Sequence, residues 1–359
     1  MRLIPRRTRL MAVVKSNAYG HGLVLVARAL ASSQRRLWFG VDSIVEATRL
    51  RHEGIKNPIL VLGSTLPTRM SEAAENQITL TISNFDSLAA LAKLKIRPDF
   101  HIKIDTGMHR QGFLPEYVFK LIKLLKRFKL VPQGVYTHLT AAKDIAYPTY
   151  TLEQLKKFNE AVLKLKKAGF KNLIRHAAAS GGTLLFPQSR LDMVRVGMGL
   201  YGYWPSPESQ IGFLSHYRGF ASIVNFELKP VLSWKTIIGE IKKIPKGSYL
   251  GYDLTERVSR KTRIAVLPIG YWHGYDRGLS SIGEVLVKGK RAKILGRVSM
   301  DMIVVDVTDI PKTRIGEDVG LIGKQGKGVI LADELALKIG TSQYEFLTRI
   351  NPLIKRILI

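Results

Sequence analysis

The chain has 359 residues, 46% of them hydrophobic, and is therefore long enough for two domains or for one large barrel with an appendage. It contains no cysteine, which excludes disulfides, thiolate metal sites and a cysteine nucleophile and fits a reducing compartment. No stretch approaches the roughly 18 apolar residues of a membrane span. The apolar run after the basic N-terminus is shorter than the roughly 7 residues of a secretion signal core. We expect a soluble, cytoplasmic protein with no membrane partner and no metal.

The formal net charge is +28 at pH 7, from 56 Lys and Arg against 28 Asp and Glu. A surplus of this size suggests a nucleic-acid partner. The basic residues are spread along the chain, however, and their clusters at 93–95, 120–129 and 156–167 fall largely in or beside predicted helices, where a solvated charged face is expected. We therefore predict no specific nucleic-acid partner.

Short apolar runs alternate with segments of helical period through the first 197 residues. The helical segments include Leu23–Leu30, Ser43–His52, Asp86–Leu94, Glu116–Arg127 and Leu152–Ala168. The runs predicted as strands are Leu10–Val14, Leu37–Val41, Ile59–Leu62, Thr79–Ile82, Phe100–Ile104, Gly134–Leu139, Leu173–Ala177 and Met193–Val196. Eight β/α repeats indicate a (β/α)8 TIM barrel. A doubly wound open sheet is the alternative, but no G-x-G-x-x-G motif opens a helix.

The pattern changes past Tyr201, where the breaker cluster Tyr203–Pro207 interrupts the chain. Short alternating runs separated by turn signals follow and predict a C-terminal, mostly β domain. A helix is predicted within it near Ala332–Ile339. The predicted strands are Val231–Ile238, Ile264–Pro268, Gly283–Val287, Ala292–Arg297, Met302–Val307 and Asp318–Ile322. We place the barrel at residues 1–222 and the β-domain at residues 223–359.

Polar side chains recur where the predicted barrel strands end, which is where barrel enzymes carry their catalytic groups. These polar residues are Lys15, Asp105, Arg110, His138, His176, Ser180 and Arg195; Met108 and Gly197 lie at the same strand ends. Lys15 stands out because it ends a buried strand just before a glycine-rich turn. Desolvation there lowers the pKa of an amine from its free value of roughly 10.4, and the uncharged amine can attack a carbonyl. An ordinary lysine with its head in water is the alternative.

The whole stretch Ala12–Gly22, A-V-V-K-S-N-A-Y-G-H-G, resembles the pyridoxal-phosphate lysine motif of alanine racemases. The resemblance extends from about Leu10 to the C-terminus and pairs a barrel with a β-domain, as in the third fold type of pyridoxal-phosphate enzymes. It implies that Lys15 carries pyridoxal 5′-phosphate and that Tyr19 contacts the phosphate. It also implies interconversion of L-alanine and D-alanine, which supplies D-alanine for peptidoglycan.

Further cofactor contacts follow from the same resemblance. His138 is expected to stack against the cofactor ring, with His176 nearby. The phosphate is expected to bind Ser180, the backbone of Gly197 and Met198, and Tyr344. Glycine-flanked N–H groups at a strand-to-helix turn suit this role. The chain departs from the common pattern at Ala179, where an asparagine often precedes the serine, and we expect some cost in cofactor positioning.

Arg195 is implied to contact the pyridine nitrogen. A carboxylate there would keep the nitrogen protonated and make the ring a strong electron sink. An arginine cannot accept that proton, so the ring stays a weaker sink. This restraint favours return of the proton to the α-carbon over side reactions such as transamination.

Racemisation needs a proton donor and acceptor on each face of the planar intermediate. Lys15 serves one face. The resemblance implies that Tyr252 serves the other, reaching the site of the partner in a head-to-tail homodimer. Because the free pKa of tyrosine is near 10, a cation such as Arg110 would have to lower it.

Substrate contacts are implied for four residues. Arg110 holds the alanine carboxylate, which its guanidinium can bind with two parallel hydrogen bonds. Tyr271 narrows the entry to suit a small side chain, and Met300 with Asp301 lies near the carboxylate. Lys103 matches a position that is carbamylated in some relatives, although an ion pair with Asp105 or a neighbour is an equal alternative.

Other enzymes remain as competing interpretations. A racemase of serine or of broad specificity has the same motifs. A decarboxylase of basic amino acids would place an acid at the ring nitrogen and use a cysteine. A non-catalytic pyridoxal-phosphate protein would resemble the barrel alone, and a nucleic-acid binder would merely keep the fold. Relatives also carry a strand and a helix before the first barrel strand, so we expect either a start upstream of Met1 or a partly open barrel.

Overall fold

The structure is a computed structural model that describes residues 3–32, 37–217 and 226–359. The chain divides into two compact units. Unit 1 comprises residues 1–18 and 23–229, and unit 2 comprises residues 19–22 and 230–359. The predicted domain boundary after residue 222 falls within 218–225, outside the described residues. The grouping of Tyr19–Gly22 with unit 2 is a feature that the sequence did not predict.

Unit 1 contains two parallel four-stranded sheets, ordered β3-β2-β1-β8 and β4-β5-β6-β7. All eight predicted strands occur: β1 (Arg9–Val13), β2 (Leu37–Val41), β3 (Ile59–Val61), β4 (Leu80–Ile82), β5 (Phe100–Lys103), β6 (Gly134–Tyr136), β7 (Ile174–His176) and β8 (Met193–Val196). Hydrogen bonds of 2.9 Å join Thr79, just before β4, to Ile59 and Val61 of β3. Asp192 N, just before β8, donates to Arg175 O of β7 at 3.1 Å. The structure thus contains two four-stranded sheets in place of the single closed sheet that was predicted. Hydrogen bonds link these sheets at both edges.

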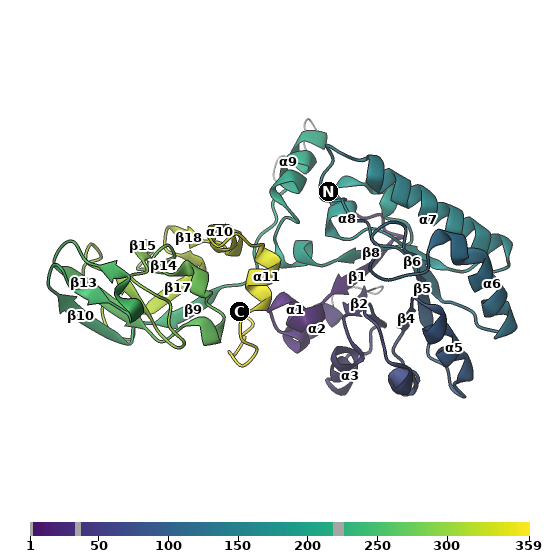
Figure 1. Ribbon diagram of the computed structural model, residues 1–359, viewed down its shortest axis with the longest axis horizontal. Helices are drawn as coiled ribbons and strands as arrows, with labels where there is room; N and C mark the ends of the chain where they lie inside the picture. Colours follow the sequence, from purple (N-terminus) through teal and green to yellow (C-terminus); the bar gives the residue numbers. More distant parts are fainter. Residues whose placement is uncertain (1–2, 33–36, 218–225) are drawn as a thin grey trace. The chain divides into compact units, whose positions relative to one another are not determined.

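Helices follow the strands along the chain and lie outside them in unit 1 (Figure 1). They are α1 (Lys15–Tyr19), α2 (Leu23–Ala31), α3 (Ile44–His52), α4 (Met70–Glu75), α5 (Phe85–Lys93), α6 (Val118–Arg127), α7 (Thr149–Lys167), α8 (Ser180–Leu185) and α9 (Pro207–His216). Polar caps fix two of the predicted starts, because Ser43 accepts from Glu46 N and Asn84 accepts from Ser87 N. Helices α4, α8 and α9 were not predicted, and α1 is a left-handed turn in the segment predicted as turn-rich.

The interior of unit 1 is a packed apolar core to which both sheets contribute. Met11, Trp38, Leu60 and Met193 form a buried cluster from β1, β2, β3 and β8. The ring of Trp38 lies 5.5 Å from that of His101 in β5, which belongs to the other sheet. Burying each large apolar side chain contributes about 1.5–3 kcal/mol. This core fixes the strands whose C-terminal ends carry the polar residues described below.

Unit 2 is mostly antiparallel β structure, as predicted. Its sheets are β10-β13-β16, β11-β12, and β15-β14-β17-β18 with β9 paired to β17. The strands are β9 (Trp234–Ile237), β10 (Glu240–Ile244), β11 (Tyr249–Leu250), β12 (Glu256–Arg257), β13 (Thr262–Leu267), β14 (Glu284–Val287), β15 (Lys290–Lys293), β16 (Ile303–Asp306), β17 (Asp318–Gln325) and β18 (Gly328–Ile330). Helices α10 (Ala332–Lys338) and α11 (Gln343–Thr348) follow. The strand predicted over Ala292–Arg297 is wrong in extent, since β15 ends at Lys293 and the chain turns at Gly296 with φ 73°.

Candidate active site

Lys15 follows β1 and opens a left-handed turn. Residues 16–19 all have φ between 51° and 55°, a conformation that costs about 1–2 kcal/mol per residue. Ala18 N donates to Val14 O at 2.8 Å, Asn17 N donates to Glu46 Oε1 at 3.2 Å, and Asn17 Oδ1 accepts from the first residue of α2 at 2.9 Å. Strain held in place in this way concentrates at functional sites.

Two acidic residues that the sequence did not single out lie beside Lys15. Lys15 Nζ is 3.3 Å from Asp42 Oδ1, just after β2, and both side chains are substantially exposed. The other oxygen of Glu46 accepts from Asp42 N at 2.8 Å, so one carboxylate ties the lysine turn to the end of β2. The pattern Ser43-x-x-Glu46 at a helix start was the available signal.

Arg195 in β8 is buried and held from several sides. Nη1 donates to His176 Nδ1 at 2.7 Å. Nη2 donates to the carbonyls of Thr137 at 2.7 Å and Ala177 at 2.9 Å, and lies 3.3 Å from His138 Nδ1. Burial lowers the pKa of Arg195 to about 10, which keeps the group cationic near neutral pH. Among the described residues, the Nε–H of Arg195 has no hydrogen-bond acceptor.

The two histidines beside Arg195 are neutral. Burial, and then the charge of Arg195, lowers the pKa of His138 to about 3 and that of His176 well below its usual value. The ring of Tyr136 stacks on His176 with centroids 4.6 Å apart. The predicted position of His138 within the sixth strand is wrong, since β6 ends at Tyr136. His138 instead lies in the loop at the C-terminal end of that strand.

Asp105 organises the loop that carries Arg110. Its Oδ1 accepts from the backbone N–H groups of Gly107, Met108 and His109 at 2.9–3.0 Å, and Oδ2 accepts from Arg110 N at 3.0 Å. Burial acts to raise the pKa of Asp105, but these four hydrogen bonds outweigh it and hold the pKa below its usual value. The carboxylate therefore fixes the backbone of Arg110, whose side chain is exposed.

Lys103, at the end of β5, is buried, and its Nζ donates to Gln111 Oε1 at 2.9 Å. The alternative of an ion pair with Asp105 is wrong, since none occurs within the described part of the chain. Burial, followed by the charges of Arg195 and Arg110, lowers the pKa of Lys103 to about 8. Lys103, Asp105 and Arg110 line a small pocket together with His138.

Ser180 and the turn after β8 meet through the serine hydroxyl. Ser180 begins α8 and is buried, and its Oγ accepts from Gly197 N at 3.1 Å and from Gly199 N at 3.3 Å. Met198 begins the short 3₁₀ turn Met198–Tyr201. The hydroxyl of Tyr201 donates to Val13 O at 3.0 Å and ties this turn to β1. The structure therefore brings together the predicted residues Ser180, Gly197 and Met198.

Tyr19 and Tyr344 contact each other within unit 2. Their ring centroids are 6.0 Å apart in an edge-to-face arrangement, and burial raises the pKa of Tyr344 to about 12. Gly20 has φ 85°, and a Cβ there would lie 2.0 Å from Leu347 O in α11. Arg356 donates to Gly20 O at 2.9 and 3.1 Å. The glycine and the arginine hold Tyr19 next to Tyr344.

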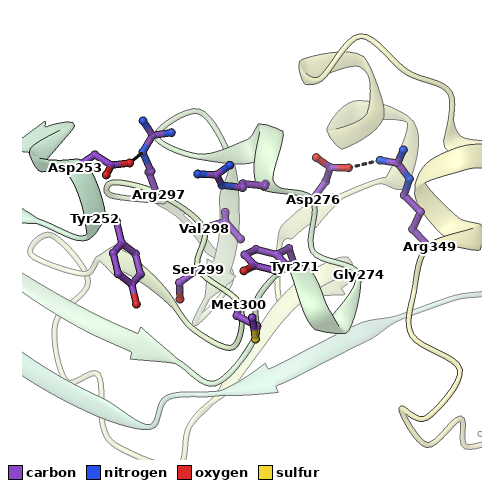
Figure 2. Close-up of a pocket in the computed structure, with 11 residues that line it drawn as sticks. Tyr252, Asp253, Tyr271, Gly274, Asp276, Arg297, Val298, Ser299, Met300 and Arg349 are labelled. Atoms are coloured by element: carbon purple, nitrogen blue, oxygen red, sulfur yellow. Dashed lines mark hydrogen bonds and ion pairs between the residues drawn. The ribbon is translucent and has the colours of Figure 1, made fainter.

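A pocket of about 890 Å³ in unit 2 contains three of the predicted residues, Tyr252, Tyr271 and Met300 (Figure 2). Its other lining residues are Asp253, Gly274, Asp276, Arg277, Arg297, Val298, Ser299 and Arg349. Tyr252 is 69% exposed. Tyr271 N donates to Ser299 O at 3.0 Å, so the turn of Tyr271 is fixed beside that of Met300. Asp301 is exposed and is not among the lining residues.

Two ion pairs frame this pocket. Arg297 Nε lies 2.7 Å from Asp253 Oδ2, and Arg349 pairs with Asp276 on the other side (Figure 2). Asp253 has φ 62°, so the turn just after Tyr252 is left-handed.

None of the described helices is both long and apolar enough to cross a membrane.

Comparison with known proteins identifies both parts of the chain. Residues 1–205 match the family "Alanine racemase, N-terminal domain", and residues 231–358 match "Alanine racemase, C-terminal domain". The alanine racemase of Leptospira interrogans is 39% identical over 353 residues, which are 98% of this chain and 89% of that protein. That of Halothermothrix orenii is 37% identical over 360 residues, 99% of this chain and 91% of that protein.

Solved structures of alanine racemases also resemble this chain. The alanine racemase of Clostridium difficile has a TM-score of 0.88 and 32% identity, covering 97% of this chain and 88% of that chain. The alanine racemase of Bacillus anthracis with bound L-Ala-P has a TM-score of 0.86 and 36% identity, covering 97% of this chain and 87% of that chain. The resemblance seen in the sequence is confirmed, and the chain belongs to the alanine racemase family.

Proposed function

We propose that this protein interconverts L-alanine and D-alanine with pyridoxal 5′-phosphate carried on Lys15, and thereby supplies D-alanine for peptidoglycan. The observation that carries the proposal is the setting of Arg195. It is a buried cation whose Nη atoms are already bound to His176 and backbone carbonyls, while its Nε–H remains available. A donor of this kind suits an unprotonated ring nitrogen.

The residues of the chain fit this cofactor. Ser180 accepts two backbone hydrogen bonds, which leaves its own O–H to donate to a phosphate oxygen. We propose that the phosphate binds the Ser180 hydroxyl, the backbone of Met198, and the hydroxyls of Tyr19 and Tyr344. The Gly197 N–H, which donates to Ser180 Oγ at 3.1 Å, would have to turn to the phosphate. His138 is neutral and half-buried, as a residue packed on an aromatic ring should be. When bound, the cofactor supplies the electron withdrawal that makes the α-hydrogen of an amino acid acidic.

Two groups of the protein move the proton. Lys15 Nζ takes or returns it on one face of the α-carbon, and the hydroxyl of Tyr252 does so on the other. We propose a homodimer in which Tyr252 completes the partner's site. The exposure of Tyr252 beside the large pocket of unit 2 supports this proposal, because such a phenol remains open to a second chain.

Arg110 is proposed to bind the alanine carboxylate, in a loop whose backbone Asp105 fixes. Tyr271 is proposed to narrow the entry, and Met300 with Asp301 is proposed to lie near the substrate carboxylate; of these two, only Met300 lines the pocket of unit 2. Lys103 is proposed to carry a carbamate. We also propose that the two sheets of unit 1 are halves of one closed barrel, because hydrogen bonds link both pairs of edge strands and Trp38 packs beside His101.

The test is direct. The purified protein is incubated with pyridoxal phosphate and L-alanine, and D-alanine is measured with a stereospecific oxidase. We expect D-alanine from the natural sequence and none from Lys15→Ala, which should also lose the visible absorption of bound cofactor. Equal D-alanine formation by both proteins would overturn the proposal. L-serine is assayed in parallel to decide between an alanine-specific and a broader racemase.

A further inference from the structure

A chain of hydrogen bonds crosses the interior of unit 1 from Arg195 to the exposed Asp99. Arg195 Nη1 lies 2.7 Å from His176 Nδ1, and His176 Nε2 lies 2.8 Å from His101 Nδ1. His101 Nε2 lies 3.3 Å from Gln133 Oε1, and Gln133 Nε2 donates to Asp99 Oδ2 at 2.8 Å. Only the first two members belong to the cofactor site described above.

The direction of every hydrogen bond in this chain is fixed by its ends. The guanidinium of Arg195 can only donate, and the carboxylate of Asp99 can only accept. His176 must therefore accept at Nδ1 and carry its proton on Nε2. His101 must do the same, and Gln133 must turn its oxygen to His101 and its NH₂ group to Asp99. A second proton on either ring would occupy its Nδ1. That atom could then no longer accept from Arg195, in the case of His176, or from His176, in the case of His101.

The backbone is shaped to admit His101. In the register of β5 and β6, His101 lies opposite Gly134. A Cβ at Gly134 would lie 2.6–2.8 Å from three atoms of the His101 ring, closer than van der Waals contact allows. The other neighbours are fixed as well, since Trp38 lies beside His101 and Tyr136 stacks on His176. The His101 imidazole therefore occupies the space that a side chain at position 134 would fill.

We propose that His101 and Gln133 are positioning residues that hold His176 in one tautomer, so that Arg195 keeps a neutral acceptor and presents its Nε–H to the cofactor ring nitrogen. The last step rests on the proposed function, whereas the tautomer is a property of the protein alone. The polarity of the chain, with a cation at one end and an anion at the other, strengthens each hydrogen bond in it.

The matched variants are His101→Gln and His101→Leu. A glutamine oxygen can accept from His176 Nε2–H, whereas leucine leaves that buried N–H without an acceptor. Gly134→Ala displaces the His101 ring without removing it. Gln133→Leu removes the hydrogen-bond acceptor of His101. Gln133 is only half-buried, so this variant provides the test if the variants in the interior fail to fold.

The measurement is ¹⁵N NMR of the full chain labelled at its 8 histidines, first without cofactor. We expect His176 and His101 to be protonated at Nε2 only. His101→Leu and Gly134→Ala should give a mixture of tautomers at His176, His101→Gln should restore the single one, and Gln133→Leu should give a mixture at His101. Protonation of His176 at Nδ1 in the natural sequence, or a tautomer indifferent to His101→Leu, would overturn the proposal.

The second measurement adds pyridoxal phosphate labelled with ¹⁵N in the ring. We expect the ring-nitrogen signal of the bound cofactor to shift in His101→Leu and to return in His101→Gln. A signal identical in all three proteins would overturn the link to Arg195. If no cofactor binds to the natural sequence, the proposed function and the step toward the cofactor fail, and the tautomer measurement still decides the positioning of His176.

Discussion

Lys103 offers the sharpest prediction, because its surroundings favour a reaction with carbon dioxide. Carbamate formation joins an uncharged amine to CO₂ and releases one proton. The pKa of Lys103 is lowered from 10.5 to about 8, which increases the uncharged fraction near neutral pH by roughly 300-fold over an ordinary lysine. At this one site the reactive form is therefore common before any gain from binding is counted.

The charges around Lys103 add to this effect. Arg195, Arg110 and Lys15 disfavour the ammonium form by repulsion and lower the pKa of Lys103, whereas Asp105 opposes them and raises it. A carbamate is an anion, so the same three cations would attract it, and in a buried site this reversal is weakly screened. The carbamate nitrogen keeps one N–H, which can still donate to Gln111 Oε1. The product thus keeps the hydrogen bond of the amine and exchanges repulsion for attraction.

The assay is ¹³C NMR of the protein in ¹³C-labelled bicarbonate. We expect one carbamate signal from the natural sequence, its absence in Lys103→Met, and its persistence in Lys93→Met, which removes an exposed lysine at the end of α5. At constant dissolved CO₂ the signal should grow as the pH rises toward 8, because the amine loses its proton there. No signal in the natural sequence, or one that survives Lys103→Met, would refute the reasoning.

Three further changes test other parts of the site. Tyr252→Phe should lower racemisation by roughly 10²–10⁴-fold while the absorption of bound cofactor is kept, and unchanged turnover would contradict its role as a base. Asp105→Asn should cost about 3 kcal/mol in urea unfolding, because four hydrogen bonds lose a charged acceptor. Since the folded pKa of Asp105 lies below the unfolded value of about 3.9, this stabilisation is present above that pH and is lost as the pH falls through the folded pKa. The difference between the two proteins should therefore shrink in acid, and a constant difference would contradict the assignment. Gly20→Ala combines a positive φ with a Cβ 2.0 Å from Leu347 O, so it should lower the unfolding midpoint, and an unchanged midpoint would argue against this packing.

The strands of unit 1 could be predicted because each is a short apolar run between turn residues. Strand β10 in unit 2 could not, since Glu240–Ile244 carries three charged residues among five and lies mostly exposed. Its formation depends on pairing with β13, whose register is a tertiary property. Helix α9 was missed for a different reason: its cap Ser206 and its first residue Pro207 lie within the breaker cluster, so residues that interrupt the chain also begin the helix.

The site itself was predictable where a residue type and its place at a strand end agreed, as at Lys15, Ser180 and Arg195. The left-handed turn after Lys15 was not predictable, because among residues 16–19 only Asn17 is of a type that favours this conformation. The turn exists because Glu46, in the next β/α unit, accepts from its backbone. That dependence on another unit lies outside any local pattern.

The series of hydrogen bonds from Arg195 to Asp99 has one feature that could be recognised in the sequence. His101 and Lys103 alternate with apolar residues in a buried strand, so two polar side chains share one face of β5. Their partners could not be inferred, because His176 is 75 residues from His101 and Gln133 is 32. Only the register of β5, β6 and β7 brings these residues together.

The positive charge that matters for catalysis lies at the strand ends of unit 1 and does not depend on lysines elsewhere on the surface. Lys15, Lys103, Arg110 and Arg195 stand at or near the strand ends. Asp42 pairs with Lys15, and the carboxylate of Asp105 is occupied by four backbone N–H groups. The neighbouring histidines cannot neutralise or add to this field, because burial and the nearby cations keep them uncharged. The ligands proposed for the site, a phosphate and an amino-acid carboxylate, are both anionic. Lys103 and Arg195 are buried, so their attraction for such groups is weakly screened whatever the net charge of the molecule. Binding of the proposed ligands therefore does not require the net charge of +28 or a nucleic-acid partner.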